Sequence, residues 1–206
     1  MRYSVNIHSS ICINDCYYFD PFQIAENRHN AKIVFITHSH YDHLEIESIR
    51  KVANADTLFV CPYDCVEILI KAGFGKSKIT EAFPNREYVV AGIKFRTIPA
   101  YNTNKKFHLK EYNWLGYSVQ IEDQICLICG DTDVTDELRA EKADIMFVPI
   151  GGTYTMTARE AAELTNIIRP KVVVPVHYGS IVGDKAQEQE FVDKVDKDVD
   201  IRIELK

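Results

Sequence analysis

The sequence lacks the long apolar segments that a membrane-spanning protein needs. No run of about 18 apolar residues occurs in the 206-residue chain, so we expect no membrane span. The first segment, Met1 to His8, also lacks the apolar centre of a signal peptide and has the composition of a first strand. Without either feature, we expect a cytoplasmic protein that does not bind membranes.

Basic residues are in the minority. The 24 lysine and arginine residues are outnumbered by 30 aspartate and glutamate residues, which gives a net charge of −6. This balance disfavours a broad nucleic-acid-binding surface. The chain also lacks serine- or glycine-rich linkers, low-complexity stretches and clear repeats, so we expect one domain over residues 1–206. Its length allows one well-buried core, and the oligomeric state stays open.

The six cysteines do not have the context of a disulfide framework. Without a secretory signal, we expect reduced thiols that pack as small hydrophobic side chains. A cysteine metal site is the alternative. However, Cys126 and Cys129 would lie on opposite faces of one strand, which does not suit a shared ion.

Metal-binding side chain types are concentrated in residues 36–44, Ile-Thr-His-Ser-His-Tyr-Asp-His-Leu. Three imidazoles and a carboxylate occupy six positions directly after the apolar run 33–36, which predicts a buried strand followed by a turn. Residues two apart in an extended segment project to the same side, so His38 and His40 can converge on one point. Asp42 and His43, beyond the bend, can converge on a second. Each residue alone could be a solvated or turn residue, but together these zinc-type ligands predict most of a binuclear metal site.

Apolar periodicity predicts the remaining elements. We expect strands over residues 3–7, 11–13, 17–19 and 58–60, helices over 44–52 and 64–71, a hairpin over 87–98 and a strand pair over 117–121 and 125–128. The later part predicts a strand over 145–150, a helix from the capping box of Thr157 and Glu160 to Pro170, a strand over 172–176, a helix over 187–195 and a strand over 201–205. Two strand-rich halves with trailing helices suggest two sheets packed face to face, an α/β four-layer αββα sandwich.

Two distant residues also follow apolar strands. Asp131 comes after residues 125–128, and Gly130 before it permits a sharp turn that can bring the carboxylate close to a metal. Alternatively, Asp131 forms a turn or caps a helix that starts near Thr135. His177 ends the strand over 172–176, at a position where α/β folds place their chemistry, although a lone histidine there could also be a core residue.

The string over residues 38–43 resembles the metal-binding motif of the metallo-β-lactamase-fold superfamily of metal-dependent hydrolases. Asp20-Pro21-Phe22, Gly130-Asp131-Thr132-Asp133 and the strand ending at His177 follow in that family's order, from about residue 4 to about residue 180. The chain is most similar to the branch grouped with ascorbate-6-phosphate lactonase, which is itself similar to N-acyl-phosphatidylethanolamine-hydrolysing phospholipase D. Segments 99–102 and 151–156 are similar to uncharacterised members of this branch. The resemblance implies the metallo-β-lactamase fold.

The resemblance also implies roles for individual residues. Asp131 would bridge two ions, His177 would be the last ligand, and Asp20 would orient a metal-bound histidine, unless it only forms an Asp-Pro turn. Most family members have a further histidine where this chain has Asn102. We expect His108, the nearest imidazole, to replace it. The expected ligands are therefore His38, His40, Asp42, His43, His108, Asp131 and His177.

Several residues near these ligands keep two interpretations. Asn102 would orient substrate or a metal-bound water. The alternative for His108 is a solvated loop residue, and if neither His108 nor Asn102 serves the site, we expect one ion rather than two. Thr153 and Tyr154, which follow a glycine pair and precede a helix, could bind an anionic group or form an ordinary loop. His8 and His29 match no motif, and the sequence predicts no role for either.

The expected function is metal-dependent hydrolysis of an ester-like bond, a phosphodiester or a lactone, in a small anionic substrate. Two divalent ions, zinc with manganese or iron as alternatives, would supply a metal-bound hydroxide at neutral pH. Asp42 and Asp131 are the expected catalytic carboxylates. A non-catalytic metal- or ligand-binding module would instead bind tightly without turnover. A di-iron redox protein would contain iron, but that pattern carries an acidic residue where His40 stands.

Overall fold

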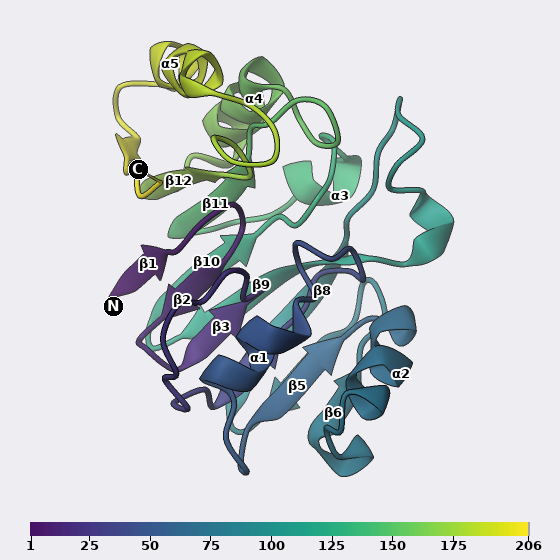
Figure 1. Cartoon of the computed structure of the whole chain (residues 1–206). Coiled ribbons are helices and arrows are strands. Elements are labelled where there is room, and N and C mark those ends of the chain that lie inside the picture. The colour runs from purple at the N-terminus through teal and green to yellow at the C-terminus, as the bar shows by residue number, and fades with distance from the viewer. Residues whose placement is uncertain (206) are drawn as a thin grey trace.

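Two β-sheets packed face to face form the centre of the computed structural model, which describes residues 1–205 (Figure 1). The first sheet has six strands in sequential order: β1 Tyr3–Val5, β2 Ile11–Ile13, β3 Tyr17–Phe19, β4 Ile33–Phe35, β5 Leu58–Cys61 and β6 Ile79–Glu81. The second has seven, in the order β13-β12-β11-β10-β9-β8-β7. Their bounds are β7 Glu87–Val90, β8 Ile93–Pro99, β9 Leu115–Ile121, β10 Gln124–Ile128, β11 Ile145–Pro149, β12 Val172–Val176 and β13 Asp200–Ile201.

The alternation of side chains along β4 shows how the layers are built. Ile33 and Phe35 point into the core between the sheets, whereas Val34 and Ile36 belong to a separate cluster on the outer face. The Phe35 ring lies 5.2 Å from Phe95 of β8, centroid to centroid, in an edge-to-face contact across the two sheets. Because β4 is buried on both faces, it is continuously apolar, which is the pattern that predicted it.

Helices cover the outer faces of both sheets. Helices α1 (Ile46–Val52) and α2 (Tyr63–Lys71) bury Ile49 and Leu69 against the first sheet. Helices α3 (Asp136–Arg139), α4 (Ala158–Ile168) and α5 (Lys185–Lys194) lie on the other side, where α4 begins at the predicted capping box of Thr157 and Glu160. Short 3₁₀ helices span Lys76–Lys78 and Lys110–Tyr112. The four-layer αββα fold predicted from the sequence is confirmed.

The predicted boundaries of several elements were wrong, β1 among them, which ends at Val5 and not at residue 7. Helix α1 starts two residues later than expected because residues 40–44 form a turn, in which the Leu44 amide donates to the His40 carbonyl at 2.9 Å. Helix α5 starts at Lys185 because Asp184 caps it and accepts a hydrogen bond from the Ala186 amide. Both differences arise from local hydrogen bonds that apolar periodicity does not show.

The last predicted strand, residues 201–205, is reduced to the two residues of β13. It pairs in parallel with the start of β12, where the Val173 carbonyl accepts a hydrogen bond from the Arg202 amide. Two residues further along β12, the next position facing β13 is Pro175, which has no amide hydrogen to donate. The ladder therefore cannot continue along β12.

The cysteines lie within the layers and form no disulfide in the described chain. All six are free thiols, and only Cys16 is partly exposed. Burial raises the pKa of the Cys61 thiol to about 12, as expected for a thiol that packs as an apolar side chain. Within residues 1–205, no helix has the length and apolar content needed to cross a membrane.

Candidate metal centre

The predicted ligands come together where the chain leaves the carboxyl ends of several strands. His38 follows β4, His108 follows β8, Asp131 follows β10 and His177 follows β12. The structure brings the seven predicted ligands together in two neighbouring groups and a third, His38, His43 and Asp131, that overlaps the first in His38 and the second in His43; it also adds His8, which follows β1, to the second group. The candidate ligand atoms within each group all lie within 4.8 Å of one another.

The first group contains His38, His40 and His108. His38 Nε2 lies 3.1 Å from His40 Nδ1, a spacing suited to two nitrogens bound to one ion. The rings of His38 and His108 are buried, whereas His40 is exposed to solvent. The predicted replacement histidine, His108, is therefore beside the other two and is not a solvated loop residue. Solvent reaches this group from the side of His40.

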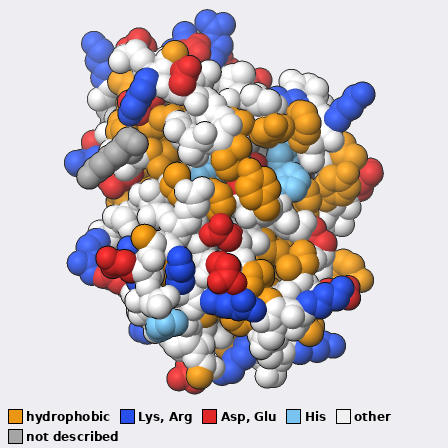
Figure 2. Space-filling model, viewed as in Figure 1, with side chains coloured by type: hydrophobic (Ala, Val, Ile, Leu, Met, Phe, Trp, Pro, Cys, Tyr) orange, Lys and Arg blue, Asp and Glu red, His pale blue; other side chains and the backbone are white. Residues whose placement is uncertain are grey.

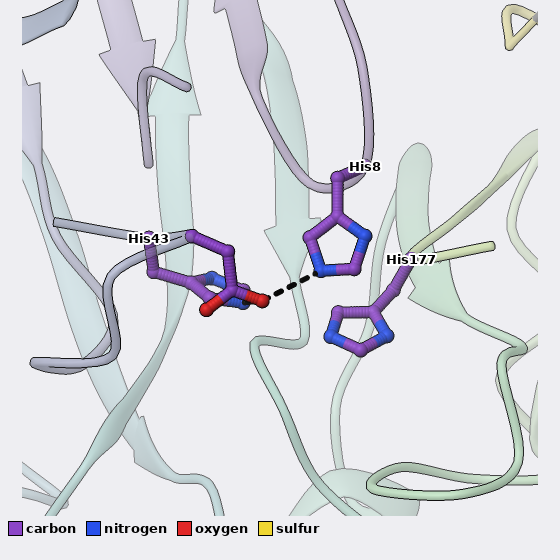
Figure 3. A group of neighbouring side chains, drawn as sticks. His8, His43 and His177 are labelled. Atoms are coloured by element: carbon purple, nitrogen blue, oxygen red, sulfur yellow. Dashed lines mark ion pairs between the residues drawn. The ribbon is translucent and has the colours of Figure 1, made fainter. Parts of the chain in front are cut away.

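The second group contains His8, Asp42, His43 and His177, and Figure 3 shows the three rings facing a common space. Asp42 Oδ2 lies 3.2 Å from His8 Nε2 and 3.8 Å from His43 Nε2. All four side chains are almost completely buried. Sequence reasoning missed His8, although a histidine directly after an apolar strand is the same signal that selected His177.

Asp131 lies between the two groups. Its Oδ2 is 2.9 Å from His177 Nε2 and 3.3 Å from His108 Nε2, so one carboxylate oxygen contacts both groups. Gly130 makes this position possible: it has a φ of +68°, and a Cβ there would lie 2.8 Å from the Leu115 carbonyl oxygen. The geometry therefore fits a carboxylate that bridges two ions better than a helix cap, and Thr135 caps α3 instead.

Asp20 and Thr37 make hydrogen-bond contacts with Nδ1 of His43 and His38, on the side of each ring away from the cluster. Asp20 Oδ2 accepts a hydrogen bond from His43 Nδ1 at 2.8 Å and another from the Thr37 hydroxyl at 2.6 Å. The Thr37 hydroxyl in turn lies 2.9 Å from His38 Nδ1, from which it can accept. This network leaves Nε2 of both rings free to face the cluster. Thr37 is a second residue that sequence reasoning missed.

Asn102 has a different environment from the one expected. Its Oδ1 lies 3.2 Å from His108 Nδ1 and accepts a hydrogen bond from the His108 amide, while its Nδ2 donates to the Tyr154 carbonyl at 2.8 Å. Asn102 therefore lies behind the His108 ring and directs Nε2 of that ring toward Asp131. Contact of Asn102 with substrate or a metal-bound water stays a prediction.

The glycine loop before α4 packs against a ligand. A Cβ on Gly151 would lie 2.4 Å from the His177 carbonyl oxygen, so only glycine allows this approach. The start of α4 is already occupied by the Glu160 carboxylate, which accepts from the Thr157 amide and hydroxyl. Thr153 is exposed, and the Tyr154 ring packs edge-to-face against Phe107. Substrate contact by Thr153 or Tyr154 stays a prediction.

Electrostatic coupling within the cluster is strong. Burial alone would raise the pKa of Asp131, but the neighbouring His177 and His43 hold it well below its usual value. Burial would lower the pKa of His43, but the carboxylates of Asp131 and Asp20 raise it to about 9. Burial lowers the pKa of His8 to about 4 and that of His38 well below its usual value. The metal-free cluster thus holds a proton on His43 and favours the neutral rings of His8 and His38, which can bind a cation.

The buried donor atoms fit divalent cations. Five of them have no hydrogen-bond partner within residues 1–205: His8 Nε2, His43 Nε2, His108 Nε2, Asp131 Oδ1 and His177 Nδ1. Buried polar atoms are almost always paired, so five unpaired ones in one cluster indicate a missing partner. Imidazole and carboxylate donors suit zinc, manganese and iron, and a cation in each group would satisfy all of these atoms except His177 Nδ1, since the other nitrogen of that ring, Nε2, is the one beside Asp131.

Comparisons with known proteins give a consistent result. A family model described as a beta-lactamase superfamily domain matches residues 16–178. A UPF0173 protein of Pyrococcus abyssi is 31% identical over 173 residues, which cover 82% of this chain and 77% of the relative. A UPF0173 metal-dependent hydrolase of Thermococcus onnurineus is 27% identical over 166 residues, 78% of this chain and 73% of the relative. The crystal structure of a provisionally assigned metal-dependent hydrolase from Parabacteroides distasonis has a TM-score of 0.79 and 26% identity, covering 99% of this chain and 93% of that one.

Replacing Gly151 with alanine should disturb the cluster through His177. The added methyl group would overlap the His177 carbonyl and the Val182 side chain, and such overpacking costs about 1–3 kcal/mol of stability. We expect a lower melting temperature and less bound metal. Gly75→Ala is the matched control, because its only neighbour within 4 Å is the Ser77 hydroxyl, at 4.0 Å. Wild-type stability and metal content in Gly151→Ala would show that the close approach is unimportant.

The raised pKa of His43 predicts how protons compete with metal. In the metal-free protein, NMR of the imidazole nitrogens should show His43 titrating with a pKa of about 9, above its usual value of 6.5. Below that pH a proton must leave before metal binds, so apparent affinity should rise with pH until His43 has titrated. The charged ring also stabilises the metal-free fold below its unfolded-state pKa, and this stabilisation is lost as pH rises through the folded-state pKa.

Asp20→Asn tests the cause of the shift, because it removes one of the carboxylates that raise the His43 pKa. The His43 midpoint should then fall, while Glu47→Gln, at an exposed acid of α1, should leave it unchanged. If His43 in the wild-type protein titrated with a pKa at or below the usual histidine value, the predicted effect of the Asp131 and Asp20 carboxylates on His43 would be contradicted.

Proposed function

The chain belongs to the beta-lactamase superfamily and, within it, to the UPF0173 group, and from this membership and its His/Asp cluster we propose that it is a hydrolase with two metal sites. One ion would be held by His38, His40 and His108, and the other by Asp42, His43 and His177. Asp131 would contact both ions. Zinc is the first candidate, with manganese or iron as alternatives.

The position of Asp131 carries this proposal. Its carboxylate contacts a ring from each group at 3.3 Å or less, and one of its oxygens is buried without a hydrogen-bond partner. A carboxylate placed this way costs free energy unless cations compensate it. When bound, two such ions lower the pKa of water from about 15.7 to about 7 and polarise the scissile carbonyl or phosphoryl group.

The protein's own residues would orient the reactants. Asp42 and Asp131 both have pKa values below the usual range, so they are ionised at neutral pH and can accept hydrogen bonds from the attacking water. His40 is the solvent-exposed ligand, so substrate would arrive from its side. Trp114 packs against all three rings of the first group, with centroid distances of 4.7 Å to His38, 4.8 Å to His40 and 5.3 Å to His108, and its indole nitrogen donates to Asp64. This arrangement limits how many waters reach the first group.

The expected substrate is small, with an anionic reacting group that the ions themselves would attract. Lys105 would not assist, because it forms an ion pair with Asp133. Figure 2 shows histidine atoms at the surface bordered by hydrophobic side chains, which suits an apolar part next to the scissile bond. A lactone or a phosphodiester as that bond rests on the resemblance of the sequence motifs to the lactonase and phospholipase D branch.

Metal analysis of His38→Ala, combined with activity assays on phosphodiesters and lactones, tests the proposal. The wild type should bind about two ions per chain. The variant should lose one of them and at least about 100-fold in activity, because a direct ligand contributes more than the residues that orient it. His29→Ala is the control, because His29 lies outside the cluster on an exposed loop.

Three other results of these experiments would contradict the proposed two-metal hydrolase. Full metal content with unchanged activity in His38→Ala would overturn the proposal. Tight ligand binding without turnover of any tested ester would indicate a non-catalytic binding module. Iron in the purified protein, with a redox-active spectrum, would indicate di-iron chemistry instead of hydrolysis.

A further inference from the structure

His8 is the histidine in the cluster that no motif predicted. The β1–β2 loop places its ring, which is fully buried, 3.8 Å from the His177 ring and 5.5 Å from the His43 ring, measured between centroids. In Figure 3 the three rings surround one space, and the dashed line joins His8 to the carboxylate of Asp42. A histidine at this position either binds an ion or only holds Asp42 in place.

The backbone fixes His8 against His177. Both residues are in the left-handed region, with φ of +56° and +61°, which residues other than glycine rarely adopt. The His177 amide donates to the His8 carbonyl at 3.0 Å, so the two turns support each other. Strained backbone of this kind persists where the surrounding structure determines it, and it clusters at functional sites.

The orientation of the His8 ring distinguishes a metal ligand from a residue that only holds Asp42 in place. His8 Nε2 lies 3.2 Å from Asp42 Oδ2, but the ring N–H is not aligned for a hydrogen bond, and Nε2 has no partner within residues 1–205. The other ring nitrogen, Nδ1, faces Ser180 on the opposite side at 3.5 Å. His43 Nε2 and His108 Nε2, which belong to predicted ligands, are unpaired in the same way.

We propose that His8 Nε2 is a direct ligand of the ion held by the second group. This inference rests on the two-metal function proposed above. With His8, the second group offers four side chains plus Asp131 and is buried throughout, whereas the first offers three plus Asp131 and includes the exposed His40. The second ion is therefore the firmly held one, and the first ion is the one that exchanges with solvent and meets substrate.

His8→Gln tests the role directly. Glutamine can still donate a hydrogen bond to Asp42 but is a poor ligand for zinc or cobalt. We expect the tighter of the two ions to bind at least ~100-fold more weakly, with the weaker ion unchanged, and the visible spectrum of the cobalt(II)-loaded protein to change. His29→Gln is the matched control, because His29 carries the same substitution outside the cluster. Wild-type affinities and spectrum in His8→Gln would show that His8 only holds Asp42.

A measurement on the wild type keeps the test valid even if the variant does not fold. In protein labelled with nitrogen-15 histidine and loaded with cadmium-113, we expect a cadmium–nitrogen coupling at Nε2 of His8, as at His43 and His177. Couplings at the other histidines without one at His8 would overturn this inference alone. If no histidine couples and the protein retains no metal, the proposed two-metal function fails as well.

Discussion

The buried carboxylate of Asp131 is the constraint on which the site depends. Burial opposes its ionised form, and the neighbouring rings of His177 and His43 compensate for that cost. Such compensation requires loops from both sheets to converge within hydrogen-bonding distance. Two contacts fasten the sheets where they meet: the Tyr117 hydroxyl of β9 donates to the Ile36 carbonyl at 2.6 Å, and the Leu115 amide donates to the Thr37 carbonyl at 3.0 Å. The core between the sheets therefore sets the geometry of the cluster.

Around this carboxylate, the protein fixes the rings by their outer nitrogens. Asp20 and Thr37 hold His43 and His38, and Asn102 holds His108 through contacts that reach the Tyr154 carbonyl. Because each supporting residue is itself hydrogen-bonded to backbone or to another support, the rings have little freedom to turn away from the cluster. A preorganised site of this kind does not need to reorder its ligands when a cation binds.

The sequence predicted those ligands that are close together in the chain and those strands that have a clear apolar pattern. It did not predict the roles of residues that only tertiary packing brings to the site. The string from His38 to His43 could be found because its ligands are neighbours in sequence, and β4 because it is apolar on both faces. The position of His8 after a predicted strand marks it as a candidate ligand, by the same rule that selected His177. That signal does not show which site His8 joins, since only the approach of the β1–β2 loop to His177 makes it part of the cluster. The contact of Asn102 with His108 had no comparable signal, because its partner lies across a loop without regular structure.

The difference in exposure between the two groups determines where substrate selection can occur. The second group is almost completely buried, and the Gly151 loop packs onto the His177 backbone beside it. The first group opens at His40, and the aromatic side chains next to its ligands in sequence, Tyr41 and Phe107, are 68% and 47% exposed. Exposed aromatic rings can change rotamer without disturbing the buried ligands, because the supporting contacts of Thr37 and Asn102 lie on the inner side. The rigid carboxylate–imidazole cluster is thereby separated from the exposed surface at the first group, where loop residues are free to contact the rest of a substrate.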